Sequence, residues 1–331
     1  MNRKIACTVA SLFVAMTSFA QTSSLKFNDN GKFKIVQFTD VHYKYNNPKS
    51  DISLERIKEV IDVEKPDLVV FTGDVIYAKP ADKGFQTVMQ PLVSAKIPFV
   101  VTFGNHDDEQ GMSRKELMDV LYKIPYNLTD TVAGLSGESN VILKVASSKG
   151  NNNAAILYCI DSNSYSSVDG IGGYDFIKPD QIEWYRQNSK EFTKQNGGTP
   201  VPSLAFFHIP LPEFRSAATT EGCSMIGTRM EKSCPPELNS GFFTSIKQMK
   251  DVMGVFVGHD HDNDYAVNYH GVMLAYGRYT GGDTVYNNLA NGARVIELTE
   301  GDKGFNTWIR LADNEVTGKA KFPQDFVRSN K

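Results

Sequence analysis

Short apolar runs that end at polar residues alternate with amphipathic segments along the first third of the chain. The apolar runs lie at residues 33–40, 66–74 and 98–108. Segments in which apolar residues recur at helical spacing occupy residues 53–65, 83–95 and 113–123. This alternation predicts βαβ units with parallel strands. Strands that are apolar throughout also predict a sheet that is covered on both faces.

The second half of the chain mixes the two kinds of pattern. Strand-like runs occupy residues 140–146, 154–160, 203–208, 255–258, 266–276, 293–300 and 305–311. Helices are predicted from Pro179 to about residue 193, with proline in the first turn, and near residues 242–251. A stretch rich in Gly, Pro and Ser at 210–240 predicts a loop. The sequence shows no internal repeat and no long linker, so residues 21–331 are predicted to form a single domain.

The first twenty residues have the pattern of an export signal. Arg3 and Lys4 precede an apolar run, and Ser18-Phe19-Ala20 supplies small residues at the cleavage positions. The apolar run is too short for a membrane span. We therefore expect residues 1–20 to be a signal peptide, the mature chain to be secreted or periplasmic, and no membrane span to remain after the signal is removed.

Composition and net charge indicate which kinds of binding partner this chain is expected to have. With 41% hydrophobic and 22% charged residues, the chain of 331 residues has the composition of an ordinary folded protein. Loss of Arg3 and Lys4 with the signal leaves 33 basic and 38 acidic residues, a net charge of −5. A nucleic-acid partner is not expected, because such proteins usually carry a strongly basic face.

Two cysteines, Cys223 and Cys234, flank a polar loop. In an oxidising compartment they can form a disulfide, and the export signal favours that interpretation. The alternative is a pair of free thiols.

Polar side chains gather at the points where the apolar strands end, and five of the six histidines lie there. Asp74 follows Asp40 by 34 residues and Asn105 follows Asp74 by 31, close to the length of one βαβ unit. Each unit returns the chain to the carboxyl edge of the sheet, where open α/β folds place their sites. The strand-end residues, expected to converge there, are Asp40, His42, Gly73, Asp74, Gly104, Asn105, His106, Asp107, His208, Gly258, His259, Asp260 and His261.

The residue types in this set indicate a metal site. Residues two apart in extended chain project to the same side, which directs Asp40 with His42, and His259 with His261, into one cavity. Histidine, aspartate and asparagine without thiolates suit divalent ions such as Zn, Mn, Fe or Ni. The glycines among the strand-end residues fit tight turns beside such a site.

The ordered motifs DVH, GDVIY, GNHD, FFH and GHDH resemble those of the calcineurin-like metallophosphoesterases. The surrounding stretches FKIVQFTDVHY, HIPLPEF, NSGFF and VFVGHDHDNDY are similar to the purple acid phosphatase-like branch of that superfamily, and the resemblance covers nearly all of the mature chain. It implies an α/β fold: a four-layer α/β/β/α sandwich with two facing mixed sheets.

The resemblance also implies roles for eight of the strand-end residues in a centre with two divalent metal ions, seven as ligands and His106 in catalysis. His106 would protonate the leaving oxygen or stabilise the charged transition state. Two ions would bring about +4 against about −2 from Asp40 and Asp74, and the remaining positive charge attracts a phosphate ester. Hydrolysis would proceed by metal-activated hydroxide. One ion would be held by Asp40, His42, Asp74 and His261, and the other by Asp74, Asn105, His208 and His259.

Three positions depart from the family pattern or are open. Purple acid phosphatases use a tyrosine at the position of Tyr77 as a metal ligand. They have glycine where this chain has His42, so we expect His42 to be the ligand and Tyr77 to line the pocket.

Protein phosphatases carry an aspartate at the Tyr77 position, and this aspartate orients the catalytic histidine. Because this chain has a tyrosine there, the partner of His106 is open, with Asp107 a possible substitute. Arg278, in YGR after a closing strand, is the best candidate for a substrate-binding residue.

We therefore predict a binuclear metallophosphoesterase that acts on a small phosphorylated substrate as a phosphomonoesterase. Two alternatives stay open. One is a phosphodiesterase for cyclic nucleotides or other diesters, and the other is a non-catalytic relative that binds a phosphorylated ligand. The metal, the physiological substrate and the oligomeric state are not fixed by the sequence.

Overall fold

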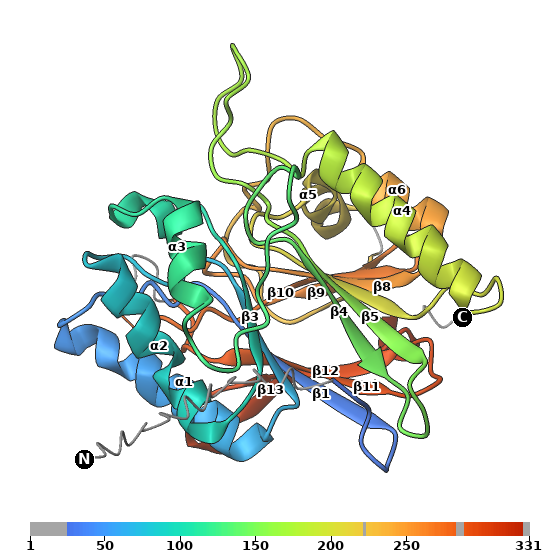
Figure 1. Cartoon of the computed structure of the whole chain (residues 1–331), viewed down its shortest axis with the longest axis horizontal. Helices are drawn as coiled ribbons and strands as arrows, with labels where there is room; N and C mark the ends of the chain where they lie inside the picture. The colour runs from blue at the N-terminus through green and yellow to red at the C-terminus, as the bar shows by residue number, and fades with distance from the viewer. Residues whose placement is uncertain (1–24, 221–222, 283–287, 327–331) are drawn as a thin grey trace, which may run out of the picture.

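The computed structural model describes residues 25–220, 223–282 and 288–326. The predicted signal peptide, residues 1–20, lies outside the described residues. Two β-sheets pack face to face, and helices cover the outer face of each sheet (Figure 1). The predicted α/β/β/α sandwich with two mixed sheets is confirmed.

The first sheet has six strands in the order β13-β12-β11-β1-β2-β3. Its parallel strands, predicted from the βαβ pattern, are β1 (Lys32–Phe38), β2 (Leu68–Thr72) and β3 (Phe99–Thr102). Its antiparallel strands are β11 (Ala293–Thr299), β12 (Phe305–Arg310) and β13 (Val316–Phe322). The helices packed on it are α1 (Asp51–Glu64), α2 (Ala81–Ala95) and α3 (Arg114–Leu121).

The second sheet has seven strands in the order β4-β5-β6-β8-β10-β9-β7. Its parallel strands are β5 (Asn153–Cys159), β6 (Ser203–Phe206), β8 (Val252–Val257) and β10 (Val272–Tyr276). Antiparallel strands are β4 (Val141–Ala146), β7 (Met225–Ile226) and β9 (Ala266–Tyr269). Its outer helices are α4 (Pro179–Gln195), α5 (Pro212–Thr219) and α6 (Phe242–Met249). Short 3₁₀ helices are η1 (Pro48–Ser50), η2 (Asp107–Gln110), η3 (Ala312–Asn314) and η4 (Gln324–Phe326).

Three apolar clusters fill the spaces between the four layers. Phe85 belongs to the cluster under α1–α3, Leu157 to the one between the sheets, and Tyr185 to the one under α4–α6. Each fully buried side chain of this size contributes about 1.5–3 kcal/mol relative to exposure. The two sheets are therefore held as one scaffold for the strand ends.

Two segments differ from the prediction. The stretch 210–240, expected to be a loop, contains α5 and β7. Pro212 occupies the first turn of α5, and Phe214 and Ala217, three residues apart, bury one face of it. Strand β13 was not predicted, although Ala320 and Phe322 alternate inward along it as in a half-buried strand. Within the described ranges, no helix has the length and apolar character needed to span a bilayer.

The predicted disulfide is not formed, because Cys223 and Cys234 are both free thiols. Cys223 packs against the apolar cluster under α4–α6. The Cys234 thiol instead lies 3.5 Å from the Lys232 carbonyl, and its backbone N–H donates to the Asp260 carboxylate at 3.2 Å. Each cysteine is thus fixed by its own surroundings.

Hydrogen bonds join the two sheets beneath the strand ends. The Gln37 side-chain amide, in β1, donates to the Val257 carbonyl of β8 at 3.0 Å and to the Thr72 hydroxyl of β2 at 2.8 Å. All three residues are buried. The carboxyl ends of strands from both sheets are therefore brought to one place, where the polar strand-end residues follow.

Candidate metal centre

Four of the predicted ligands have left-handed backbone conformations, which non-glycine residues rarely adopt. The φ angles are 50° at Asp40, 46° at His42, 50° at Asp74 and 81° at His259. Each costs about 1–3 kcal/mol and persists only where surrounding contacts impose it. Here the backbone N–H of His42 donates to the Asp74 carbonyl at 2.9 Å, so the turns after β1 and β2 hold each other.

Asp40, His42 and His261 form a first cluster, with one ligand atom from each within 4.8 Å of the others. His261 Nε2 lies 3.4 Å from Asp40 Oδ1, and His42 Nε2 lies 3.9 Å from the same oxygen. All three side chains are buried. The backbone N–H of His259 donates to both oxygens of Asp40, at 3.1 and 3.0 Å, and fixes the carboxylate.

Asp74, His208 and His259 form a second cluster that meets the same distance limit. His208 Nε2 lies 3.2 Å from Asp74 Oδ2 and 3.3 Å from His259 Nδ1. Asn105 Oδ1 lies 3.2 Å from the same His208 nitrogen. The four residues expected around the second ion are therefore brought together.

Asp74 connects the two clusters. Its Oδ2 atom lies 3.4 Å from His42 Nε2 and 3.2 Å from His208 Nε2. Two ligands of one zinc-like ion, with bonds of about 2.1 Å, lie about 3.0–3.4 Å apart. The spacing on both sides of Asp74 thus fits two cations that share its carboxylate.

Buried nitrogen atoms of the centre have lone pairs that a bound cation could use. His42 Nε2 is buried and has no hydrogen-bond partner among the residues that the structure describes. His208 Nδ1 donates to the Thr72 carbonyl at 2.7 Å, which leaves the lone pair of Nε2 for a ligand. The residues present therefore fit a pair of divalent ions bound by nitrogen and oxygen.

The electrostatics keep Asp74 ionised. Burial lowers the pKa of His42, but the nearby carboxylates of Asp40 and Asp74 outweigh it and raise the pKa to about 9. Burial likewise lowers the pKa of His208, and Asp74 outweighs it and raises the pKa to about 9. Burial raises the pKa of Asp74, but His208 and His42 outweigh it and hold the pKa well below its usual value. The carboxylate is thus available as a ligand.

Two strand-end glycines are required by close approach of the ligands. A Cβ atom on Gly104 would lie 2.1 Å from Asp74 Oδ1. One on Gly258 would lie 1.9 Å from the Thr39 hydroxyl and 2.7 Å from Asp40 Oδ2. Any side chain at either position would displace a predicted ligand.

Asp107 is not the partner of His106, which corrects the sequence-based suggestion. Its buried carboxylate accepts hydrogen bonds from four backbone N–H groups, at 2.8–3.3 Å. Asp107 therefore ties the turn after β2 to the turn after β3. The donors are Asp74, Val75, Ile76 and Gly104.

His106 lies at the rim of the centre, with its ring centroid 5.5 Å from that of His42. Its backbone N–H donates to Asp74 Oδ1 at 2.8 Å. Its Nδ1 atom lies 2.6 Å from Glu109 Oε2. The partner is thus Glu109, a residue that the motif comparison did not single out.

The sequence profile described as calcineurin-like phosphoesterase matches residues 33–263. The chain belongs to the calcineurin-like phosphoesterase family. The resemblance inferred from the motifs is confirmed, and the protein is a hydrolase that acts on phosphoric ester bonds.

Curated relatives refine the placement within the family. An Arabidopsis thaliana protein named "probable inactive purple acid phosphatase 29" is 35% identical, and the match covers 90% of this chain and 87% of the relative. The phosphatase DCR2 of Saccharomyces cerevisiae is 33% identical over 87% of this chain and 55% of its own length. The name of the Arabidopsis relative agrees with the purple acid phosphatase-like resemblance.

Solved structures share the fold of this phosphoesterase. A dimetal phosphatase from Danio rerio aligns with a TM-score of 0.59 at 12% identity, over 87% of this chain and 99% of that one. GAP50 of Plasmodium, described as the anchor in the inner membrane complex, aligns with a TM-score of 0.58 at 13% identity, over 88% of each chain. Proteins that share this fold therefore have different roles.

Aromatic rings border the metal centre of this phosphoesterase. The Tyr77 ring lies 5.0 Å from that of His42 and 5.1 Å from that of His106, and the residue is 38% exposed. On another side, the Tyr174 ring lies 4.2 Å from that of His259 and 5.8 Å from that of Tyr165. The choice of His42 rather than Tyr77 as ligand stays a prediction.

Arg278 has a different environment from the one expected of a substrate-binding residue. Its side chain is buried, and its Nε atom donates to Asp264 at 3.0 Å within an ion pair. A second nitrogen donates to the Ala290 carbonyl at 2.8 Å. Since its donors are engaged with the protein, Arg278 holds the closing segments together, and we do not assign it to the substrate.

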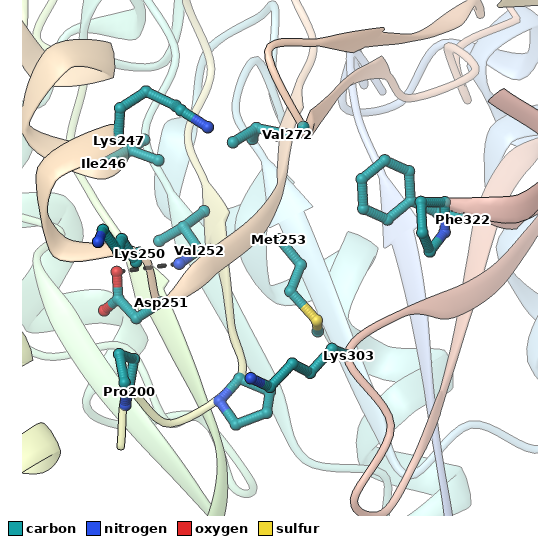
Figure 2. Close-up of a pocket in the computed structure, with 13 residues that line it drawn as sticks. Pro200, Ile246, Lys247, Lys250, Asp251, Val252, Met253, Val272, Lys303 and Phe322 are labelled. Carbon is teal, nitrogen blue, oxygen red and sulfur yellow. Dashed lines mark hydrogen bonds between the residues drawn. The ribbon is translucent and has the colours of Figure 1, made fainter. Parts of the chain in front are cut away.

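A separate pocket of about 480 Å³ lies at the other end of the second sheet (Figure 2). Its lining includes Val252 and Met253, at the start of β8, and none of the predicted ligands. Because the ligands follow the end of β8, a six-residue strand, the two places are about 20 Å apart. The pocket is not part of the metal centre.

Proposed function

We propose that this chain is a phosphomonoesterase that works with two divalent ions. The observation that carries the proposal is the position of Asp74 Oδ2, 3.4 Å from His42 Nε2 and 3.2 Å from His208 Nε2, between two ligand clusters. One ion would be held by Asp40, His42, Asp74 and His261, and the other by Asp74, Asn105, His208 and His259.

The chain's own residues hold and orient the reacting groups. When bound, the ions would polarise the phosphoryl group and lower the pKa of the attacking water. Asp74 spans both sites, and the His259 N–H bonds keep Asp40 in a fixed orientation. His208 presents Nε2 because its Nδ1 proton is held by Thr72.

His106 is the proposed proton donor. Its side chain is 28% exposed, so it faces solvent and an incoming ester more than the buried ligands do. With Nδ1 on Glu109, its Nε2 is the nitrogen left for the departing oxygen. A proton from Nε2 would neutralise that oxygen as the P–O bond breaks.

A catalytically silent relative is the second candidate, because the Arabidopsis relative is named probable inactive. The fold also occurs in a Plasmodium protein that is described as an anchor. The complete pair of ligand clusters and the His106–Glu109 contact favour catalysis in this chain.

The leader-like residues 1–20 support the further proposal that the enzyme acts outside the cytoplasm.

Turnover of p-nitrophenyl phosphate against its bis ester tests the proposal. A monoesterase is expected to show kcat/KM at least about 10-fold higher for the monoester than for the bis ester. A chelator should abolish turnover and added Mn²⁺ or Zn²⁺ should restore it. Faster hydrolysis of the bis ester would identify a diesterase instead. No turnover of either ester by protein that holds two ions would favour the silent relative.

A further inference from the structure

We propose that Glu109, anchored by Tyr165, is the positioning residue of His106. The inference rests on the proposed function, since it assigns His106 the role of proton donor. It goes further by naming the carboxylate that sets the orientation of that histidine, and a tyrosine from a distant loop that sets the carboxylate.

The local fold explains why Glu109 faces His106. Residues Asp107–Gln110 form the 3₁₀ helix η2, with His106 immediately before it. A 3₁₀ helix has three residues per turn, so side chains three apart lie one above the other. The Glu109 N–H accordingly donates to the His106 carbonyl at 3.2 Å, and the side chains meet at 2.6 Å between Oε2 and Nδ1.

The other oxygen of Glu109 is also held. The Tyr165 hydroxyl, from the segment between β5 and α4, donates to Glu109 Oε1 at 2.8 Å. The Asn105 side-chain amide donates to the same hydroxyl at 3.2 Å. The Tyr165 ring is stacked on Tyr174, whose ring lies perpendicular to the His259 ring with the centroids 4.2 Å apart. A continuous chain of contacts thus runs from two predicted metal ligands through Tyr165 to Glu109 and His106.

This arrangement determines which nitrogen of His106 is available. Glu109 Oε2 is an acceptor, so it holds the proton on Nδ1 and leaves Nε2 as the ring nitrogen that can donate to the departing oxygen. In the proposed step, water oxygen forms a bond to phosphorus while the ester P–O bond breaks. His106 enters the step as an imidazolium with a proton on each ring nitrogen. Its Nε2 proton moves to the departing oxygen, which leaves as an alcohol, and the water gives up a proton to solvent. The Nδ1 proton stays on His106 throughout, in its hydrogen bond to Glu109.

A leaving-group series tests the positioning role. Glu109→Ala should lower kcat about 10- to 100-fold for an alkyl phosphate, which needs a proton on the departing oxygen, and about 3-fold or less for p-nitrophenyl phosphate. KM and the content of two ions per chain should not change. Glu109→Gln should recover part of the loss, because its amide oxygen can still accept a hydrogen bond from Nδ1–H. Asp108→Asn, the same change of charge one residue away on η2, is the matched control.

Coupling to His106 is tested with His106→Ala and the double variant. If Glu109 acts through His106, adding Glu109→Ala to His106→Ala should change kcat less than about 2-fold, because the shared effect is already lost. Full additivity, or equal losses for alkyl and aryl esters, would overturn the proposal.

A signal that does not depend on turnover separates this inference from the proposed function. In zinc-loaded wild-type protein, the His106 Nδ1 proton should give a downfield NMR resonance that disappears in Glu109→Ala and weakens in Tyr165→Phe. Its absence from the wild-type spectrum would overturn the inference even if the enzyme is active. Wild-type protein that shows the resonance but hydrolyses no ester would contradict the proposed function alone.

Discussion

Asp74→Asn is expected to lower kcat about 1,000-fold or more, because the loss of several kcal/mol of metal-based stabilisation corresponds to a factor of this size. The carboxylate Oδ2 lies within 3.4 Å of ligand nitrogens in both clusters. In the variant, an amide group would replace the charge that both ions share. The Oδ1 side can keep the bond from the His106 N–H, so the turn itself should be retained.

The measurement combines metal analysis with steady-state kinetics. We expect wild-type protein to retain two ions per chain and Asp74→Asn to retain one or none. Asp119→Asn, on the exposed face of α3, is the control for removal of a negative charge. A variant at position 74 that keeps both ions and more than about a tenth of wild-type kcat would show that Asp74 does not bridge.

His106→Ala is expected to lower kcat about 10²- to 10⁴-fold, the usual contribution of a general acid. Metal content should stay at two ions per chain, because His106 lies at the rim and belongs to neither ligand cluster. This separates its role from that of Asp74.

His270→Ala is the matched control for the loss of a histidine. His270 is the one histidine outside the strand-end set, it is exposed, and it should be replaceable without effect. The comparison is made with an alkyl phosphate in the presence of excess metal. Unchanged kcat in His106→Ala, or loss of an ion, would contradict the assigned role.

The convergence of the ligands could be predicted from the sequence because it depends on spacing. The intervals from Asp40 to Asp74 and from Asp74 to Asn105 match βαβ units, and the parallel strands β1, β2 and β3 deliver these residues to one edge. His208 and His259 follow strands of the other sheet. Their approach to Asp74 required the packing of two sheets, which only the family resemblance implied.

The hydrogen-bond partners of the site residues could not be predicted in the same way. Asp107 and Glu109 are both acidic and both close to His106 in sequence, and motif comparison favoured the nearer one. The structure separates them, since Asp107 is turned inward to four backbone donors while the 3₁₀ turn places Glu109 over the imidazole. The spacing of three residues was the available signal, but it needed the 3₁₀ conformation to be interpreted.

Long-range pairing explains the other differences. Arg278 follows a closing strand, as a substrate-binding arginine would, but its guanidinium meets Asp264 across the β9–β10 hairpin. The disulfide was inferred only from the expected oxidising compartment and from the position of the two cysteines at the ends of a loop. Neither of these observations indicates which atoms surround each thiol. Strand β13 pairs with β12 at the sheet edge, where its alternation VTGKAKF is weakly apolar.

Anomalous X-ray diffraction from crystals grown with Mn²⁺ or Zn²⁺ tests the central claim most directly. The account predicts two peaks, one within bonding distance of Asp40, His42 and His261 and the other within bonding distance of Asn105, His208 and His259, with the Asp74 carboxylate in contact with both. A single peak, or two peaks that do not share Asp74, would contradict it.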